Sequence, residues 1–66
     1  MYKLMLRILD ENYEQVKESV VAKHQSVEAM QSELNKRFIN RSVNELMIES
    51  YRRENSFNEY FVTFMK

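Results

Sequence analysis

The sequence lacks the residue types that most often mark boundaries or reinforce the core of a small protein. Its 66 residues include no cysteine, no glycine and no proline. Without cysteine, no disulfide or thiolate metal site can supplement the core, and without glycine no Gly-rich phosphate-binding loop can form. Boundaries between elements must therefore be predicted from capping residues and periodicity alone.

The chain also has no excess charge of either sign and no long apolar run. Ten Lys and Arg balance ten Asp and Glu, so the overall basic field of many nucleic-acid-binding proteins is absent. No run approaches the roughly 18 apolar residues of a membrane span. Lys3 and Arg7 interrupt the region where a signal peptide would be continuously apolar. We therefore expect a cytoplasmic protein with no membrane segment.

The length predicts a single domain, residues 1–66, whose core is too small to be robust. A chain of this size buries only about 60% of the surface that its unfolded form exposes, and oligomerisation is the usual remedy when disulfides and metals are excluded. Catalysis is not expected, because His24 is the only histidine and no carboxylate is placed by local spacing to orient it. We predict no catalytic residue, no metal site and no cofactor.

The N-terminal stretch MYKLMLRIL has the alternation of a β-strand. Apolar residues occupy the positions Tyr2, Leu4, Leu6 and Ile8. Because neighbouring side chains on a strand face opposite ways, Lys3, Met5 and Arg7 share the other face. A lone strand cannot satisfy its own backbone donors and acceptors, so residues 2–8 must pair with another strand.

Helical patterns follow this strand. Asp10 is a candidate N-cap, and the apolar residues from Tyr13 to Leu34 are mostly three or four apart, which is helical spacing. The stretch KHQS is the only plausible stop in this region, with Ser26 as a second cap. Ser42 and Glu45 match the Ser-x-x-Glu capping box, which predicts a helix from about 43 to 53.

The C-terminal stretch SFNEYFVTFMK fits two structures. Its aromatic residues match a helical stripe, whereas YFVTF has strong β propensity, which favours a second strand slightly. So much aromatic surface on a small chain must be covered by the fold or by a partner. The residues available to dock another protein are Phe57, Tyr60, Phe61 and Phe64.

Three segments resemble the ribbon-helix-helix DNA-binding family: the strand ending in LRI, the acidic helix start LDENYEQVKE, and NRSVNELMIESYRR. Proteins of this family pair one strand from each of two subunits into an antiparallel ribbon that enters the DNA major groove. RSVN lies further along the chain than the family's second helix, whereas HQSVEAM lies at the family's spacing. The start of the second helix therefore has two alternative registers.

The resemblance implies a set of DNA-contacting residues. Those on the strand, expected to project toward base edges, are Lys3, Met5 and Arg7. Those at the start of the second helix, expected to hold a DNA phosphate at its backbone amides, are Arg41, Ser42, Val43 and Asn44.

Two hypotheses follow from the sequence. The first is a mainly α, ribbon-helix-helix-like homodimer with an extra C-terminal segment, which binds double-stranded DNA and acts as a transcriptional repressor. The alternative is an α+β protein in which Tyr2 to Ile8 pair within the chain with Tyr60 to Phe64. That protein would be a small interaction module that binds or inhibits a larger protein through its terminal strand or aromatic tail.

Overall fold

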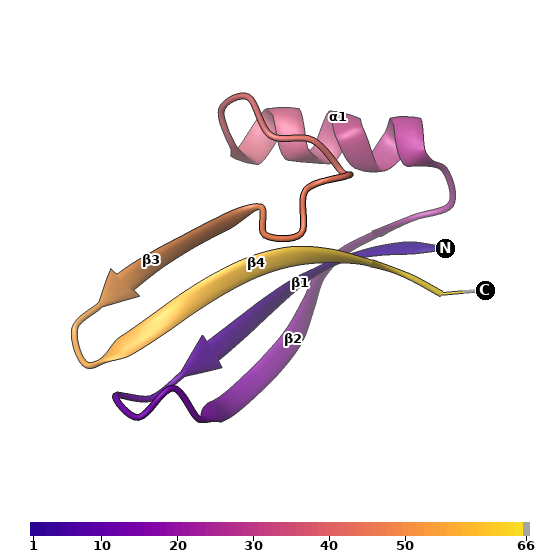
Figure 1. The fold of residues 1–66 in the computed structure, drawn as a ribbon. Helices are drawn as coiled ribbons and strands as arrows, with labels where there is room; N and C mark the ends of the chain where they lie inside the picture. The colour runs from indigo at the N-terminus through magenta and orange to yellow at the C-terminus, as the bar shows by residue number, and fades with distance from the viewer. Residues whose placement is uncertain (66) are drawn as a thin grey trace.

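The structure, a computed structural model, describes residues 1–65 and is a four-stranded antiparallel sheet with one helix on one face (Figure 1). Its elements are β1 (Tyr2–Leu9), β2 (Gln15–His24), α1 (Val27–Arg37), β3 (Glu49–Arg53) and β4 (Ser56–Phe64). The strand order is β2-β1-β4-β3. The prediction of a mainly α fold is therefore wrong, and the chain has a sheet-rich α+β fold.

The first and last strands pair at the centre of the sheet. The β1–β4 register runs from Tyr2 opposite Phe64 to Leu9 opposite Phe57, as the alternative fold predicted. The start of β1 and the end of β4 lie side by side (Figure 1), and the Met1 ammonium donates to the Met65 carbonyl oxygen at 2.7 Å. The intermolecular ribbon is wrong for a simple reason: β2 and β4 already occupy both edges of β1.

A strand, β2, replaces the first predicted helix. Asp10 does accept hydrogen bonds from backbone amides, those of Asn12 at 2.8 Å and Glu14 at 3.0 Å, but it does so in a hairpin turn. Tyr13 has a φ of 63° in this turn, a conformation that ends any helix. The valines of β2 fit a strand as well as a helical spacing, since β-branched side chains pack well on a pleated surface.

The single helix α1 begins where the sequence predicted a cap. Ser26 Oγ accepts a hydrogen bond from the Ala29 amide at 3.1 Å. Met30 and Leu34, one turn apart, are the buried residues of the helix. Lys36 and Arg37 lie in its last turn, where cations interact favourably with the helix dipole.

The predicted helix at 43–53 is also wrong. Ser42 and Glu45 do form reciprocal bonds: the Ser42 amide donates to Glu45 Oε2 at 2.6 Å, and the Glu45 amide donates to the Ser42 carbonyl at 3.0 Å. These bonds close one turn of the segment 38–48, and the chain then enters β3. The C-terminal stretch forms β4, so the prediction of a second strand there is confirmed.

The core lies between α1, the segment 38–48 and one face of the sheet. Four side chains have no exposed surface, and these are Leu4, Met30, Leu34 and Ile48. Tyr60 packs at the margin of this cluster, with the Phe38 ring edge-on to it at a centroid distance of 5.1 Å. Burial, together with the nearby Tyr51, raises the pKa of Tyr60. The core is therefore one-sided and small.

We expect Leu4→Ala to destabilise the protein severely. Its side chain is fully buried in the β1 position beneath the helix, and truncating a buried leucine costs about 2–5 kcal/mol, a large share of the stability of a small domain. Leu46→Ala is the matched control because Leu46 is 97% exposed; its free energy of unfolding should change by about 0.5 kcal/mol or less. Urea denaturation measures both, and equal effects would contradict the position of the core.

Candidate interaction surface

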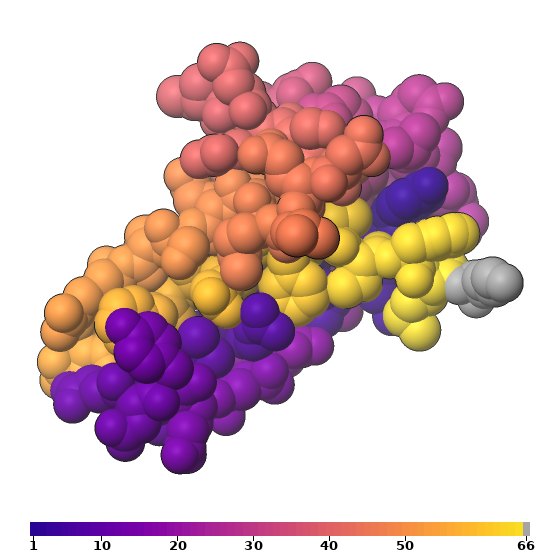
Figure 2. Space-filling model, in the orientation of Figure 1, coloured from indigo at the N-terminus to yellow at the C-terminus, as the bar shows by residue number. Residues whose placement is uncertain are grey.

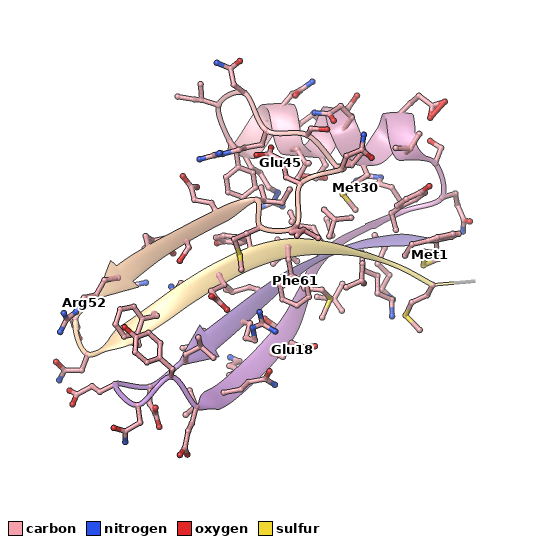
Figure 3. All side chains as sticks on the ribbon, viewed as in Figure 1. Met1, Glu18, Met30, Glu45, Arg52 and Phe61 are labelled. Atoms are coloured by element: carbon pink, nitrogen blue, oxygen red, sulfur yellow. The ribbon has the colours of Figure 1, made fainter. Side chains whose placement is uncertain are left out.

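The sheet face turned away from α1 has no cover within the described chain. Figure 3 shows Met30 directed from α1 toward the sheet, whereas Phe61 lies on the side of β4 away from the helix. The strand registers place the following residues on this face, which we call the open face: Lys3, Met5, Arg7, Leu9, Gln15, Glu18, Val20, Lys23, Ser50, Arg52, Phe57, Glu59, Phe61 and Thr63. None of them is buried.

The residues of the open face form rows across the strands. Proceeding along β1, the rows are Lys23–Lys3–Thr63, Val20–Met5–Phe61, Glu18–Arg7–Glu59–Ser50 and Gln15–Leu9–Phe57–Arg52. The first row is cationic, the second is apolar, the third contains two carboxylates around one guanidinium, and the fourth combines apolar and polar groups with one cation. The face thus has chemically distinct rows rather than a uniform polar surface.

Arg7 contacts two residues of β4 at the centre of the open face. Its Nε donates to Glu59 Oε1 at 2.9 Å, and its guanidinium lies 4.7 Å from the centroid of the Phe61 ring. Both residues belong to β4, so one side chain of β1 joins an ion pair and a cation–π contact on the neighbouring strand. The guanidinium thereby covers part of the Phe61 ring in the isolated chain.

Phe57 has comparable neighbours at the hairpin end of the sheet. The Tyr13 ring stacks on it with a centroid distance of 4.7 Å, and the Arg52 guanidinium lies 5.6 Å from its centroid. Tyr13 remains 68% exposed. Figure 2 shows the two hairpin ends of the sheet extending beyond the part that the helix covers.

Lys3 and Lys23 form the opposite, cationic end of the open face. They lie directly opposite each other on neighbouring strands, an arrangement that destabilises a sheet through like-charge repulsion. Within residues 1–65 neither lysine forms an ion pair. This row therefore carries positive charge that the fold itself does not neutralise.

The predicted DNA-contacting residues fall into two separate groups. Lys3, Met5 and Arg7 share the open face, as the alternation predicted. The predicted phosphate-binding group, Arg41, Ser42, Val43 and Asn44, lies in the segment 38–48, and Val43 packs against the core on the helix side of the sheet. Arg41 also pairs with Glu45 at 3.6 Å. The structure does not bring the two groups together.

The aromatic residues of the C-terminal tail are likewise divided between the two faces. Phe57 and Phe61 lie on the open face. Tyr60 borders the core, and Phe64 stacks on Tyr2 at a centroid distance of 4.8 Å. Only the first two can contribute to one docking surface with Met5 and Arg7.

The important residues that sequence reasoning missed are the neighbours of Lys3 and Arg7 on other strands. Glu18 falls within the helical pattern predicted after Asp10, Lys23 belongs to the stretch KHQS that was expected to end it, and Glu59 carried no distinguishing motif. The alternation Phe57, Glu59, Phe61 was a usable signal for a shared face once the tail was taken as a strand. The pairing of these residues with β1 depends on register, which no local motif specifies.

The two edges of the sheet are poorly suited to strand addition. The edge strand β2 has two register irregularities against β1, at Val16 and Val21, and β-bulges discourage edge-to-edge pairing. The other edge, β3, has only five residues and carries Arg52 and Arg53. The open face, rather than either edge, is therefore the better candidate for binding.

A second polar cluster lies where β2 meets α1. Glu33 Oε1 is 3.0 Å from His24 Nε2, and Glu33 Oε2 accepts from Arg37 Nε at 2.6 Å. The fold thus places the Glu33 carboxylate beside His24, a pairing that the local spacing of the sequence did not predict. The cluster links strand to helix, and no group of three or more His, Asp or Glu side chains in residues 1–65 is arranged to bind a metal ion.

Other site types find no support in the described residues. The surface of residues 1–65 contains no pocket, and α1, the one helix there, is not long and apolar enough to cross a membrane. Comparisons with protein-family models, curated proteins and solved structures gave no match. The function must be argued from the open face itself.

The Glu33 cluster predicts a specific acid dependence. Hydrogen bonds from His24 and Arg37 lower the pKa of Glu33 from its ordinary value of 4.5. Because the pKa is lower in the folded state, the stabilising contribution is present above pH 4.5 and is lost as the pH falls through the lowered value. Glu33→Gln should therefore be less stable than the parent at neutral pH, and the difference should shrink in acid.

Chemical denaturation at a series of pH values measures this difference. Glu54→Gln, which removes a carboxylate from the exposed β3–β4 turn, is the control for a general change in charge. A stability difference between Glu33→Gln and the parent that stays constant through the acid range would contradict the role of the cluster.

Proposed function

We propose that this protein is a small interaction module that binds another protein through its open sheet face. The single observation that carries the proposal is the centre of that face, where Met5, Phe61 and Arg7 are neighbours and none is buried. Protein interfaces are enriched in aromatic residues, Met and Arg. Energetic hot spots favour Tyr and Arg. The open face supplies Arg7 and Arg52, and Tyr13 of the β1–β2 turn stacks on Phe57 beside them.

The balance of charge also supports a protein partner. The open face carries Lys3, Arg7, Lys23 and Arg52 against Glu18 and Glu59, so its positive and negative charges are interspersed. Such a surface suits a folded protein with its own mixed charges better than the uniformly anionic backbone of a nucleic acid. The Arg7–Glu59 pair is already formed, so its charges need no partner to neutralise them.

The test uses Met5→Glu, which places a charge at the centre of the face. Tagged parent protein and variant are used to capture proteins from an extract of the source cells, and the captured proteins are quantified. We expect at least one protein to be retained by the parent and lost with Met5→Glu, because an unpaired charge in an apolar interface is costly.

Leu46→Glu is the matched control, since Leu46 is 97% exposed and lies in the segment 38–48, outside the strands that form the open face. Circular dichroism verifies that both variants fold. Equal capture by the parent, Met5→Glu and Leu46→Glu would contradict the proposal.

DNA binding is a second candidate, favoured by one observation. Lys3 and Lys23 lie opposite each other without an ion-pair partner in residues 1–65, next to Met5 and Arg7. Such a row suits phosphate contacts, which carry the sequence-independent part of DNA affinity. The residues Arg41 to Asn44 lie on the other side of the sheet and are not part of this candidate surface.

Titration of labelled duplex DNA at several salt concentrations tests the second candidate. If both lysines contact phosphates, the double variant Lys3→Ala, Lys23→Ala should bind more weakly and should reduce the salt slope by roughly 0.9 per lysine. Lys36→Ala, on the helix, is the control. No binding by the parent at low salt would eliminate this candidate.

A further inference from the structure

We infer that the open face binds the open face of a second copy of this chain, with the two-fold axis along the β1–β4 ladder. This inference rests on the proposed function of that face and names its partner. A two-fold interface must be self-complementary, because the same patch occurs on both subunits. An axis that lies between the two sheets, parallel to the strands and midway between β1 and β4, places β1 of each subunit over β4 of the other.

The two central strands complement each other residue by residue. On the open face, Met5 of β1 lies opposite Phe61 of β4, and Arg7 lies opposite Glu59. Because the two-fold operation exchanges the two strands, each pair within one sheet is repeated between the sheets. Met5 then lies over Phe61 of the partner subunit, and Arg7 lies over Glu59 of the partner subunit. The four charged groups alternate in sign, so each neighbouring pair of them is attractive.

The hairpin end of the sheet continues the same pattern. Leu9 lies opposite Phe57 within the sheet, so the operation places Leu9 over Phe57 of the partner subunit. Tyr13 stacks on Phe57 and is 68% exposed, so its ring adds apolar surface at this end. Stacked sheets cross at about 30°, but the two central strands lie nearest the axis, where this rotation displaces residues least. The interface therefore has an apolar zone on each side of a charged centre.

Other two-fold arrangements bring like charges together. An axis across the strands keeps each strand over its own copy, so an axis at Met5 places Lys3 over Arg7 of the partner subunit. An axis across the strands at Arg7 places this arginine over its own copy. An axis midway between β1 and β2 places Lys3 over Lys23 of the partner subunit. Like charges at an interface are repulsive, which disfavours all three.

The arrangement along the β1–β4 ladder keeps the lysines away from other cations. Lys3 lies opposite Thr63 within the sheet, so it faces this neutral residue in the partner subunit. The operation also places β2 over β3, but β3 begins at Glu49, opposite Tyr60. No β3 residue therefore faces Lys23, which stays in water beyond the end of that strand. The repulsion of the lysine row is avoided.

The area of the face is sufficient for a weak dimer. With strands of eight residues, as in β1, and spacings of about 3.3 Å along and 4.8 Å between strands, four strands cover roughly 500 Å². Two such faces bury on the order of 1,000 Å², near the lower bound for a specific interface. Only four side chains are fully buried in the isolated chain, so a second apolar layer would also give the sheet the core that it lacks on this side.

The decisive experiment reverses one charge at a time at the centre of the interface. Arg7→Glu and Glu59→Arg, each alone, turn both intersubunit contacts between these positions into like-charge contacts. Each should therefore weaken self-association by about tenfold. An equimolar mixture should restore dimerisation, because in the mixed dimer each of these contacts again joins a carboxylate to a guanidinium. An axis across the strands does not bring the two positions together and predicts no such recovery.

Analytical ultracentrifugation over a concentration series measures the parent, both variants and their mixture, after circular dichroism has verified that the variants fold. The parent should change from monomer to dimer with increasing concentration, and a parent that stays monomeric throughout overturns the inference. Variants that are not weakened, or that are weakened without recovery in the mixture, overturn the arrangement along the ladder. Lys36→Glu and Glu28→Lys make the same changes of net charge on α1, and each should dimerise like the parent.

A second measurement uses the parent sequence only and so does not depend on the folding of variants. Deuterated protein with protonated methionine methyl groups is mixed with unlabelled protein, so that all aromatic protons belong to the unlabelled chain. We expect nuclear Overhauser effects from the Met5 methyl group to the Phe61 ring of the partner subunit, while the buried Met30 should show none. Absence of the Met5 contact in a sample that ultracentrifugation shows to be dimeric overturns the proposed interface.

These outcomes distinguish the inference from the proposed function on which it rests. A monomeric parent that still loses a captured protein upon Met5→Glu leaves the open face as a binding surface for a different protein and rejects only the second copy. A monomeric parent that captures nothing dependent on Met5 rejects both.

Discussion

The structure depends on the pairing of β1 with β4, the two ends of the chain. This ladder runs from Tyr2–Phe64 to Leu9–Phe57, and each remaining strand attaches to one side of it. An isolated two-stranded hairpin is at best marginally stable in water, so neither β1–β2 nor β3–β4 is expected to persist alone. Closing the ladder brings together residues separated by almost the whole chain. Such contacts form slowly, because the entropy of loop closure is lost before the paired strands contribute any stabilising free energy.

The central ladder also divides the molecule into two unlike faces. Alternation places Leu4 and Tyr60 toward α1 and leaves Met5 and Phe61 on the other side. Antiparallel sheets often expose one face to water, and that face is then mostly polar. Here it instead has an apolar row at its centre, partly covered by the guanidinium of Arg7. This contact lowers the exposure of the Phe61 ring while keeping a polar group at the surface.

Features that depend on local alternation and capping could be predicted from the sequence. Features that depend on which residues pair between strands could not. The strand at residues 2–8, the Ser26 cap and the C-terminal strand were correctly predicted. The segments at 15–24 and 49–53 were assigned to helices because valines four residues apart and a Ser-x-x-Glu pattern fit a helix. In this structure the Asp10 carboxylate accepts backbone amide hydrogen bonds, and the Ser42 amide bonds the Glu45 carboxylate, but both sets of bonds close turns. Capping residues alone therefore do not establish that a helix follows. For the site, alternation placed Lys3, Met5 and Arg7 on one face, but only pairing brought Glu59 and Lys23 beside them.

The side-chain contacts among residues of the open face affect the free energy with which this face would bind a partner. Desolvating an unpaired charge is costly, and an interface that orders long side chains loses conformational entropy. Arg7 already bonds Glu59 at 2.9 Å and packs on Phe61, so the centre of the face enters a complex with its charge paired and its arginine ordered. Lys3 and Lys23 lie at one end of the face, where water remains accessible and charges affect orientation and association rate more than affinity. The apolar row would therefore supply most of the binding free energy, and the lysine row would determine which way the partner lies across the strands.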